Sequence, residues 1–135
     1  MGMYTELFLD CDIDSNLLTV DEKIIIDYLF CPDFDWYNTN PEDLNLPSHN
    51  FFNCYRWSSI GRGGSAYFTD DIPQLLIKND NIWSIVSRSD FKNYDDEIEL
   101  FLDWFTPFII KNTEQPTFVG HEHYEENEEP TLIFV

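Results

Sequence analysis

The sequence of 135 residues has few basic side chains: 7 Lys and Arg stand against 26 Asp and Glu, a formal net charge of −19. A charge of this sign and size repels phosphate backbones and anionic lipid headgroups. We therefore expect no direct binding to nucleic acid and none to a membrane. A basic protein partner is favoured for the same reason.

Cysteine is scarce as well. Cys11, Cys31 and Cys54 are odd in number and widely spaced, so they provide neither a disulfide framework nor a Cys-x-x-Cys metal site. No apolar run approaches the roughly 20 residues that span a bilayer, and the first ten residues lack the basic start of a signal peptide. These absences favour a soluble protein of the cytoplasm.

A catalytic signature is also missing. No serine lies in a nucleophile elbow, and Cys54 has no expected helix N-terminus or base beside it. Carboxylate pairs for acid and base catalysis do not stand out among 26 acids. We expect no enzyme activity, no catalytic residue and no cofactor.

What the chain does have is enough apolar and aromatic residues, 43% and 17%, for a packed core inside an acidic shell. The length fits a single domain over residues 1–135. Its clearest amphipathic helix is predicted at Phe91–Ile110, where apolar residues recur every three or four positions. Asn93 or Asp95 can cap its start, and Pro107 should end or bend it.

The remaining periodicities predict a first helix, which begins at a Thr19–Glu22 capping box and ends before Pro32. They also predict strands at Met3–Ile13, Phe51–Ile60, Ser65–Thr69, Gln74–Lys78, Ile82–Ser89, Phe118–Tyr124 and Thr131–Val135. The order β-α-β-β-β-β-α-β-β is typical of an α+β domain. We expect a mostly antiparallel sheet of about six or seven strands, with two helices packed on one face.

Three local features have a functional and a structural interpretation. The long loop between Pro32 and Asn50 carries Trp36 and Tyr37, which either anchor a partner or pin the loop to the core. The Gly61–Gly64 cluster lies between predicted strands, which favours a hairpin turn over a phosphate-binding loop.

His121 and His123 share one face of a predicted strand and would need a third ligand, Glu125 or Glu126, to bind a metal. We interpret this face as polar and exposed to water, with no metal.

The distribution of acids is the strongest functional feature. No basic residue precedes Lys23 or follows Lys111. If the terminal strands are neighbours in the sheet, their carboxylates join those of the Phe91–Ile110 helix in a nearly uniform negative surface that resembles rows of phosphates. The alternative is an acidic coat that only provides solubility. The residues expected to bind a partner are Asp95, Asp96, Glu99, Glu125, Glu126, Glu128 and Glu129, with Trp36 and Tyr37 as aromatic anchors.

The segments NYDDEIELFLDWFTPFI, GHEHYEENEEPTLIF and CYRWSS resemble a group of small acidic proteins of bacterial phages and mobile elements that has no known activity. The resemblance assigns no functional residue. It implies a bacterial host and a genomic setting in which small, non-enzymatic inhibitors of host defence are frequent.

The leading hypothesis is therefore an acidic inhibitor of the anti-CRISPR or anti-restriction type, which mimics nucleic acid and blocks the basic groove of a host defence protein. One alternative is an immunity or antitoxin protein that neutralises a basic toxin. Another is a sponge for a nucleotide signal, or a metal-dependent enzyme, that uses His121 and His123 or Arg56, Arg62 and Arg88. The arginine set requires convergence on one pocket lined by Trp57, Tyr67 and Trp83. The sequence leaves the oligomeric state open.

Overall fold

The computed structural model describes residues 3–30, 39–61 and 75–135. Three features predicted from the sequence lie outside these residues: the aromatic anchors Trp36 and Tyr37, the strand at Ser65–Thr69, and most of the Gly61–Gly64 turn. The described residues do not test these three features, so each stays a prediction.

Five strands form one antiparallel sheet in the spatial order β2-β3-β1-β4-β5. Their bounds are β1 (Thr5–Asp14), β2 (Leu75–Asn79), β3 (Ile82–Phe91), β4 (Phe118–Tyr124) and β5 (Thr131–Phe134). The central strand β1 pairs along its whole length with β3 and over its first half with β4. The first strand of the chain is therefore a neighbour of the C-terminal β4–β5 hairpin through β4, which is the condition that a joint acidic surface requires.

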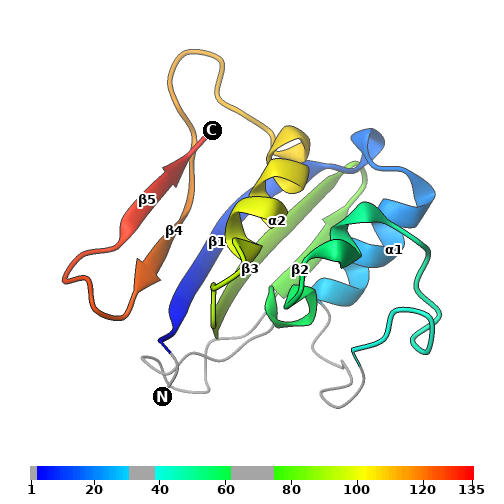
Figure 1. Ribbon diagram of the computed structural model, residues 1–135. Coiled ribbons are helices and arrows are strands. Elements are labelled where there is room, and N and C mark those ends of the chain that lie inside the picture. Colours follow the sequence, from blue (N-terminus) through cyan, green and yellow to red (C-terminus); the bar gives the residue numbers. More distant parts are fainter. Residues whose placement is uncertain (1–2, 31–38, 62–74) are drawn as a thin grey trace.

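Two α-helices accompany the sheet, α1 (Val20–Leu29) and α2 (Glu97–Phe105). The α+β class is confirmed, but the described residues form five strands instead of the six or seven predicted. Figure 1 shows α2 across β1 and β3, α1 towards the β2 side, and β4 and β5 extending beyond α2 on the other side. That both helices pack on one face of the sheet stays a prediction. None of the helices in the described part of the chain is long and apolar enough to cross a membrane.

The core lies on one side of β1, because alternate side chains of this strand are buried. Leu7, Leu9 and Ile13 are fully buried and pair in register with buried positions of β3. Ile25, Ile26 and Leu29 of α1 and Ile98, Phe101 and Phe105 of α2 complete this core. At the junction with β4, Gly120 has φ +150°, and a Cβ there would meet the Phe8 carbonyl oxygen at 1.9 Å. Only glycine allows β4 to approach β1 this closely.

The strand predicted at Phe51–Ile60 is wrong, because this segment forms two 3₁₀ turns, η2 (Asn50–Asn53) and η3 (Trp57–Ser59). Its buried side chains recur at every third position, which matches the 3.0 residues per turn of a 3₁₀ helix and not the two-residue period of a strand. They are Phe51, Cys54, Trp57 and Ile60.

The helix predicted at Phe91–Ile110 is shorter than expected at both ends. Phe91 still belongs to β3, and Asp96 has φ 57°, a left-handed conformation that prevents the helix from extending backwards. The N-cap residue is Asp96, not Asn93 or Asp95 as predicted, and its side chain makes no cap hydrogen bond. Asn93, from the loop before the helix, accepts the Ile98 N–H at 3.0 Å through its side-chain oxygen. Beyond Phe105 the chain tightens into a 3₁₀ turn that contains Pro107. The predicted capping box of α1 is confirmed.

Candidate acidic interface

The outer face of α2 and its N-cap residue carry three exposed acids, Asp96, Glu99 and Asp103. Their spacing of three and four residues places them in one stripe along the helix. A rise of about 1.5 Å per residue puts neighbouring carboxylates about 5 Å apart along the axis, against about 3.4 Å per phosphate on one DNA strand. Within the described part of the chain, no salt bridge neutralises these three acids.

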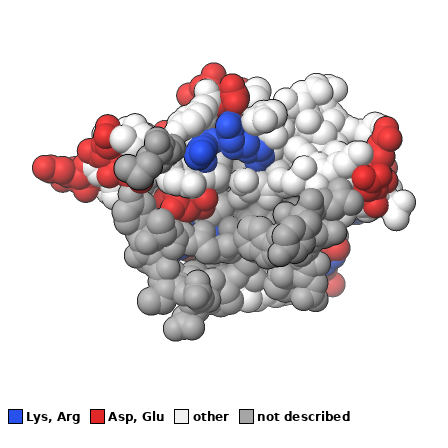
Figure 2. Space-filling view, turned by 60° about the horizontal axis from the view of Figure 1, so that its bottom comes forward, with Lys and Arg blue, Asp and Glu red and all other residues white. Residues whose placement is uncertain are grey.

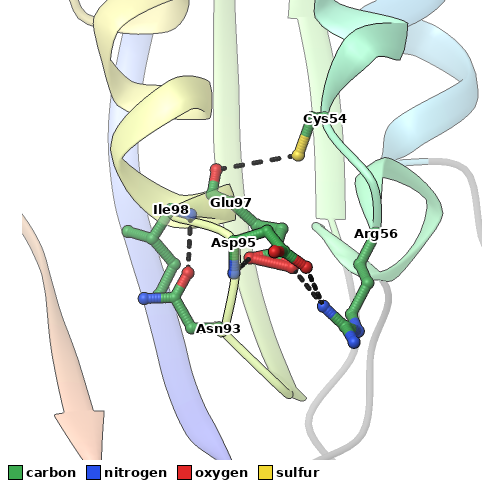
Figure 3. Close-up of polar contacts among 6 residues, drawn as sticks. All are labelled: Cys54, Arg56, Asn93, Asp95, Glu97 and Ile98. Atoms are coloured by element: carbon green, nitrogen blue, oxygen red, sulfur yellow. Dashed lines mark hydrogen bonds and ion pairs between the residues drawn. The ribbon is translucent and has the colours of Figure 1, made fainter.

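An ion-pair cluster around one buried carboxylate fixes the start of α2 (Figure 3). The carboxylate of Glu97 is fully buried and accepts from Arg56 at 2.6 Å and from the Asp95 N–H at 2.9 Å. Arg56 also donates to the Asp95 carboxylate at 3.0 Å, and the Cys54 thiol donates to the Glu97 carbonyl at 3.9 Å. Asp95, one of the acids predicted to bind a partner, is therefore already paired within the protein.

The turn between β4 and β5 carries the other predicted acids. Glu126, Glu128 and Glu129 are exposed, whereas Glu125 is half-buried and its N–H donates to the Tyr4 carbonyl. The Asn127 N–H donates to the Tyr124 carbonyl within the turn. Figure 2 shows Asp and Glu atoms in several separate groups, with Lys and Arg atoms between them. On this side of the molecule the negative surface is therefore patchy and not uniform.

A cavity of about 250 Å³ joins the α2 region to the β4–β5 hairpin. It is lined by Met3, Thr5, Asn93, Tyr94, Glu122, Tyr124, Asn127 and Thr131. Burial raises the pKa of Glu122, and the nearby charge of Glu99 raises it further. A carboxylate of α2 thus acts electrostatically on one of β4. We call the combined set the acidic surface: Asp96, Glu99, Asp103, Glu122, Glu125, Glu126, Glu128 and Glu129.

The two histidines of β4 share the sheet face that lies opposite the core, as their alternation predicts. The prediction that this face is exposed to water is wrong here, because Glu6 is buried and both histidines are half-buried. His121 contacts Glu6 at 3.1 Å and lies 5.2 Å from the Phe8 ring, between ring centroids. His123 contacts the Asn127 carbonyl at 2.7 Å. Among residues 3–30, 39–61 and 75–135, no three His, Cys, Asp or Glu side chains are grouped as metal ligands.

The basic groups invoked for a nucleotide pocket do not converge in the described residues. Arg56 belongs to the cluster at the start of α2, whereas Arg88 lies over the Phe8 ring on the sheet face opposite the core. Trp57 and Trp83, expected to line the pocket, are buried in the core. Arg62 lies outside the described residues, and those described give this alternative no support.

Neither of the two cysteines in the described part of the chain, Cys11 and Cys54, is a reactive nucleophile. Burial raises the pKa of Cys11 to about 12, and the charges of Asp10 and Asp12 add to this. The pKa of Cys54 is raised to about 11, first by burial and then by the charge of Glu97. Both thiols are therefore protonated at neutral pH.

The sequence did not reveal a second cavity, of about 480 Å³, on the η2 side of α2. Trp104 forms part of its wall, and its indole N–H donates to Glu22 at 2.6 Å. Burial raises the pKa of Glu22, but hydrogen bonds from Trp104, the Thr19 N–H and His49 outweigh it, so the pKa is lowered overall. The sequence signal that could have revealed this cavity is the three-residue period of apolar residues in Phe51–Ile60. This period identifies the 3₁₀ turn η2, which forms the wall opposite Trp104.

A scan against protein-family models finds no match to this chain. Searches of curated proteins and of solved structures find no significant similarity either. The acidic surface and the second cavity are therefore interpreted from their own geometry.

Proposed function

We propose that this protein is a non-enzymatic binding protein whose acidic surface docks in the basic groove of a nucleic-acid-binding partner and blocks it. The observation that carries the proposal is the convergence of two acidic segments around Glu122. The pairing of β4 with β1 places the β4–β5 turn beside the start of α2. Segments far apart in sequence thus contribute acids to one patch of negative surface, and within it the stripe on α2 has a charge spacing comparable to that of a phosphate row.

The electrostatics of Glu122 support binding over a coat that only provides solubility. A solubility coat gains from carboxylates that are spread out and solvated. Glu122 is instead half-buried beside Glu99, and its raised pKa means that the folded protein disfavours its charged form. A basic partner would relieve this repulsion on binding, which is typical of a functional site.

The resemblance to phage proteins suggests the setting. We propose that the partner is a defence nuclease of a bacterial host, or its regulator, and that binding takes place in the host cytoplasm. Long-range attraction would then accelerate association, and salt would weaken it.

The first experiment is to capture a partner from host lysate with the tagged protein and to measure whether the protein displaces DNA or RNA from it. We expect displacement near one to one that weakens as salt rises. The triple variant Glu126→Lys, Glu128→Lys, Glu129→Lys should slow association at least tenfold at low salt, because it reverses the charge of the turn.

The matched control reverses three exposed acids outside the acidic surface, Glu42→Lys, Asp43→Lys and Glu114→Lys, and so changes the net charge equally. This control should associate within about threefold of the unmodified protein, because the local field at the interface is retained. Equal slowing by the two triples would show that net charge alone acts and would contradict the proposal. A captured partner that binds no nucleic acid would contradict the mimicry and favour the immunity-protein alternative.

A further inference from the structure

The second cavity lies between α2 and η2 and combines apolar walls with an acidic rim. Its volume is about 480 Å³, and its walls are formed by His49, Asn50, Phe51, Asn53, Cys54, Leu100, Asp103 and Trp104. None of these lining residues is a lysine or an arginine. Asp103, at the rim, is exposed and belongs to the acidic stripe of α2. The cavity therefore opens beside the proposed binding surface.

The aromatic wall of this cavity is held in place before any ligand binds. The Trp104 indole is anchored to Glu22 by the 2.6 Å hydrogen bond. Its ring stacks on Phe51 with centroids 4.8 Å apart and lies 4.9 Å from the His49 ring. A wall fixed on several sides loses little conformational entropy when it binds a ligand.

The hydrogen bonds of His49 indicate that this imidazole is neutral. Its Nδ1 accepts the Phe51 N–H at 3.0 Å and so carries no proton, and its Nε2 is left to donate to Glu22 at 3.3 Å. A neutral His49 adds no positive charge to the cavity. The charge around the cavity therefore comes from Asp103 at the rim and Glu22 behind Trp104, and it is negative.

We propose that this cavity receives an arginine side chain of the basic partner. The aliphatic stem of arginine fits the apolar wall of Phe51 and Leu100, and its guanidinium fits between the Trp104 face and the Asp103 carboxylate. Arginine suits the site better than lysine, because its planar group stacks on aromatic rings. The same protein already uses this contact internally, since the Arg56 guanidinium lies 4.8 Å from the centroid of the Tyr55 ring. The inference rests on the proposed function and gives the interface a central anchor.

The test uses N-acetyl-L-arginine amide as the probe and the full chain labelled with ¹⁵N. The indole N–H signal of Trp104, assigned by its loss in Trp104→Phe, should shift saturably as the probe is added. Asp103→Asn should weaken binding about three- to fivefold, the factor that an exposed ion pair supplies. The uncharged N-acetyl-L-norvaline amide should bind more weakly than the arginine probe.

Glu99→Gln is the matched control, because it removes the same charge one turn earlier on α2 at a residue that does not line the cavity. It should change the affinity less than twofold. Equal weakening by Asp103→Asn and Glu99→Gln would overturn the inference, because the attraction would then be general. Probe-induced shifts that spare the Trp104 indole would overturn it as well.

The outcomes separate this inference from the proposed function. If the arginine probe leaves the Trp104 indole signal unshifted while the Glu126→Lys, Glu128→Lys, Glu129→Lys variant slows association with a captured partner as expected, the arginine site is overturned and the acidic-surface proposal stands. If the probe binds as expected but no nucleic-acid-binding partner is blocked, the site is supported and the proposed function fails.

Discussion

Two sets of acids at α2 are arranged in opposite ways. At the start of the helix, Glu97 is fully buried and shares Arg56 with the exposed Asp95, so one cation within the protein offsets part of the charge of these two carboxylates. On the outer stripe, Asp96, Glu99 and Asp103 are exposed and unpaired by any salt bridge of the described residues. Neighbouring positions of one short segment are therefore arranged differently: the inner acids hold the helix in place, and the outer acids face solvent.

The difference matters because exposed and buried charges contribute differently to stability. Removing one member of a buried ion pair costs several kcal/mol, whereas exposed charges contribute little to folding. If the comparison is right, inner substitutions should lower stability, and outer substitutions should affect binding while leaving the fold intact.

The largest expected effect comes from Arg56→Met, which leaves the buried Glu97 carboxylate without its cation. We expect the free energy of unfolding to fall by about 3 kcal/mol, measured by urea denaturation. The double variant Arg56→Met, Glu97→Leu should recover part of this loss, because it also removes the buried charge.

Lys78→Met provides the control for this pair. Lys78 forms an ion pair with Asp27 at 2.6 Å, but the two side chains are 47% and 55% exposed. Its removal should cost less than about 1 kcal/mol. Equal losses of unfolding free energy for Arg56→Met and Lys78→Met would show that the buried Glu97 does not make the inner cluster more stabilising than an exposed ion pair.

The sequence predicted those parts of the fold that depend on local order. The alternation in β1, the Thr19–Glu22 capping box and the four strands β2 to β5, which pair as two hairpins, are found close to their predicted positions. The late start of α2 was not predictable locally, because the left-handed Asp96 is followed by a glutamate whose partner, Arg56, lies 41 residues away.

The candidate sites likewise depend on contacts that the local sequence does not predict. The sequence could not predict that β1 and β4 are neighbours, because strand order is set by packing and not by local pattern. The second cavity depends on Trp104 and Glu22, which are 82 residues apart, and on His49, for which the sequence indicates no partner. Such contacts become visible only when the chain is folded.

A second prediction concerns Glu122 and Glu22, whose pKa values are shifted in opposite directions. Because the pKa of Glu122 is raised in the folded state, the folded protein binds more protons than the unfolded chain just above pH 4.5, and stability falls as pH rises through this window. Glu122→Gln should therefore raise the free energy of unfolding at pH 7 and have little effect at pH 4.

Glu22→Gln should do the reverse. Its lowered pKa gives stability that is present above pH 4.5 and lost as pH falls through the folded value. The variant should therefore be less stable than the unmodified protein at pH 7 and approach it in acid. Urea denaturation at several pH values measures both differences. A change of stability in the same direction at pH 7 for the two variants would contradict the opposite pKa shifts assigned to Glu122 and Glu22.

The smallest effect on folding is expected from the outer stripe. In the triple variant Asp96→Asn, Glu99→Gln, Asp103→Asn, two contributions oppose each other: repulsion among the acids is relieved, and their favourable interaction with the positive end of the helix dipole is lost. We expect the free energy of unfolding to change by no more than about 0.5 kcal/mol, with thermal and urea denaturation as the measurements. The same variant should associate with a captured partner at least tenfold more slowly at low salt, because it loses charge where the partner docks. A loss of stability as large as that of Arg56→Met would show that the outer acids also hold the fold, and the division between the two sets would not stand.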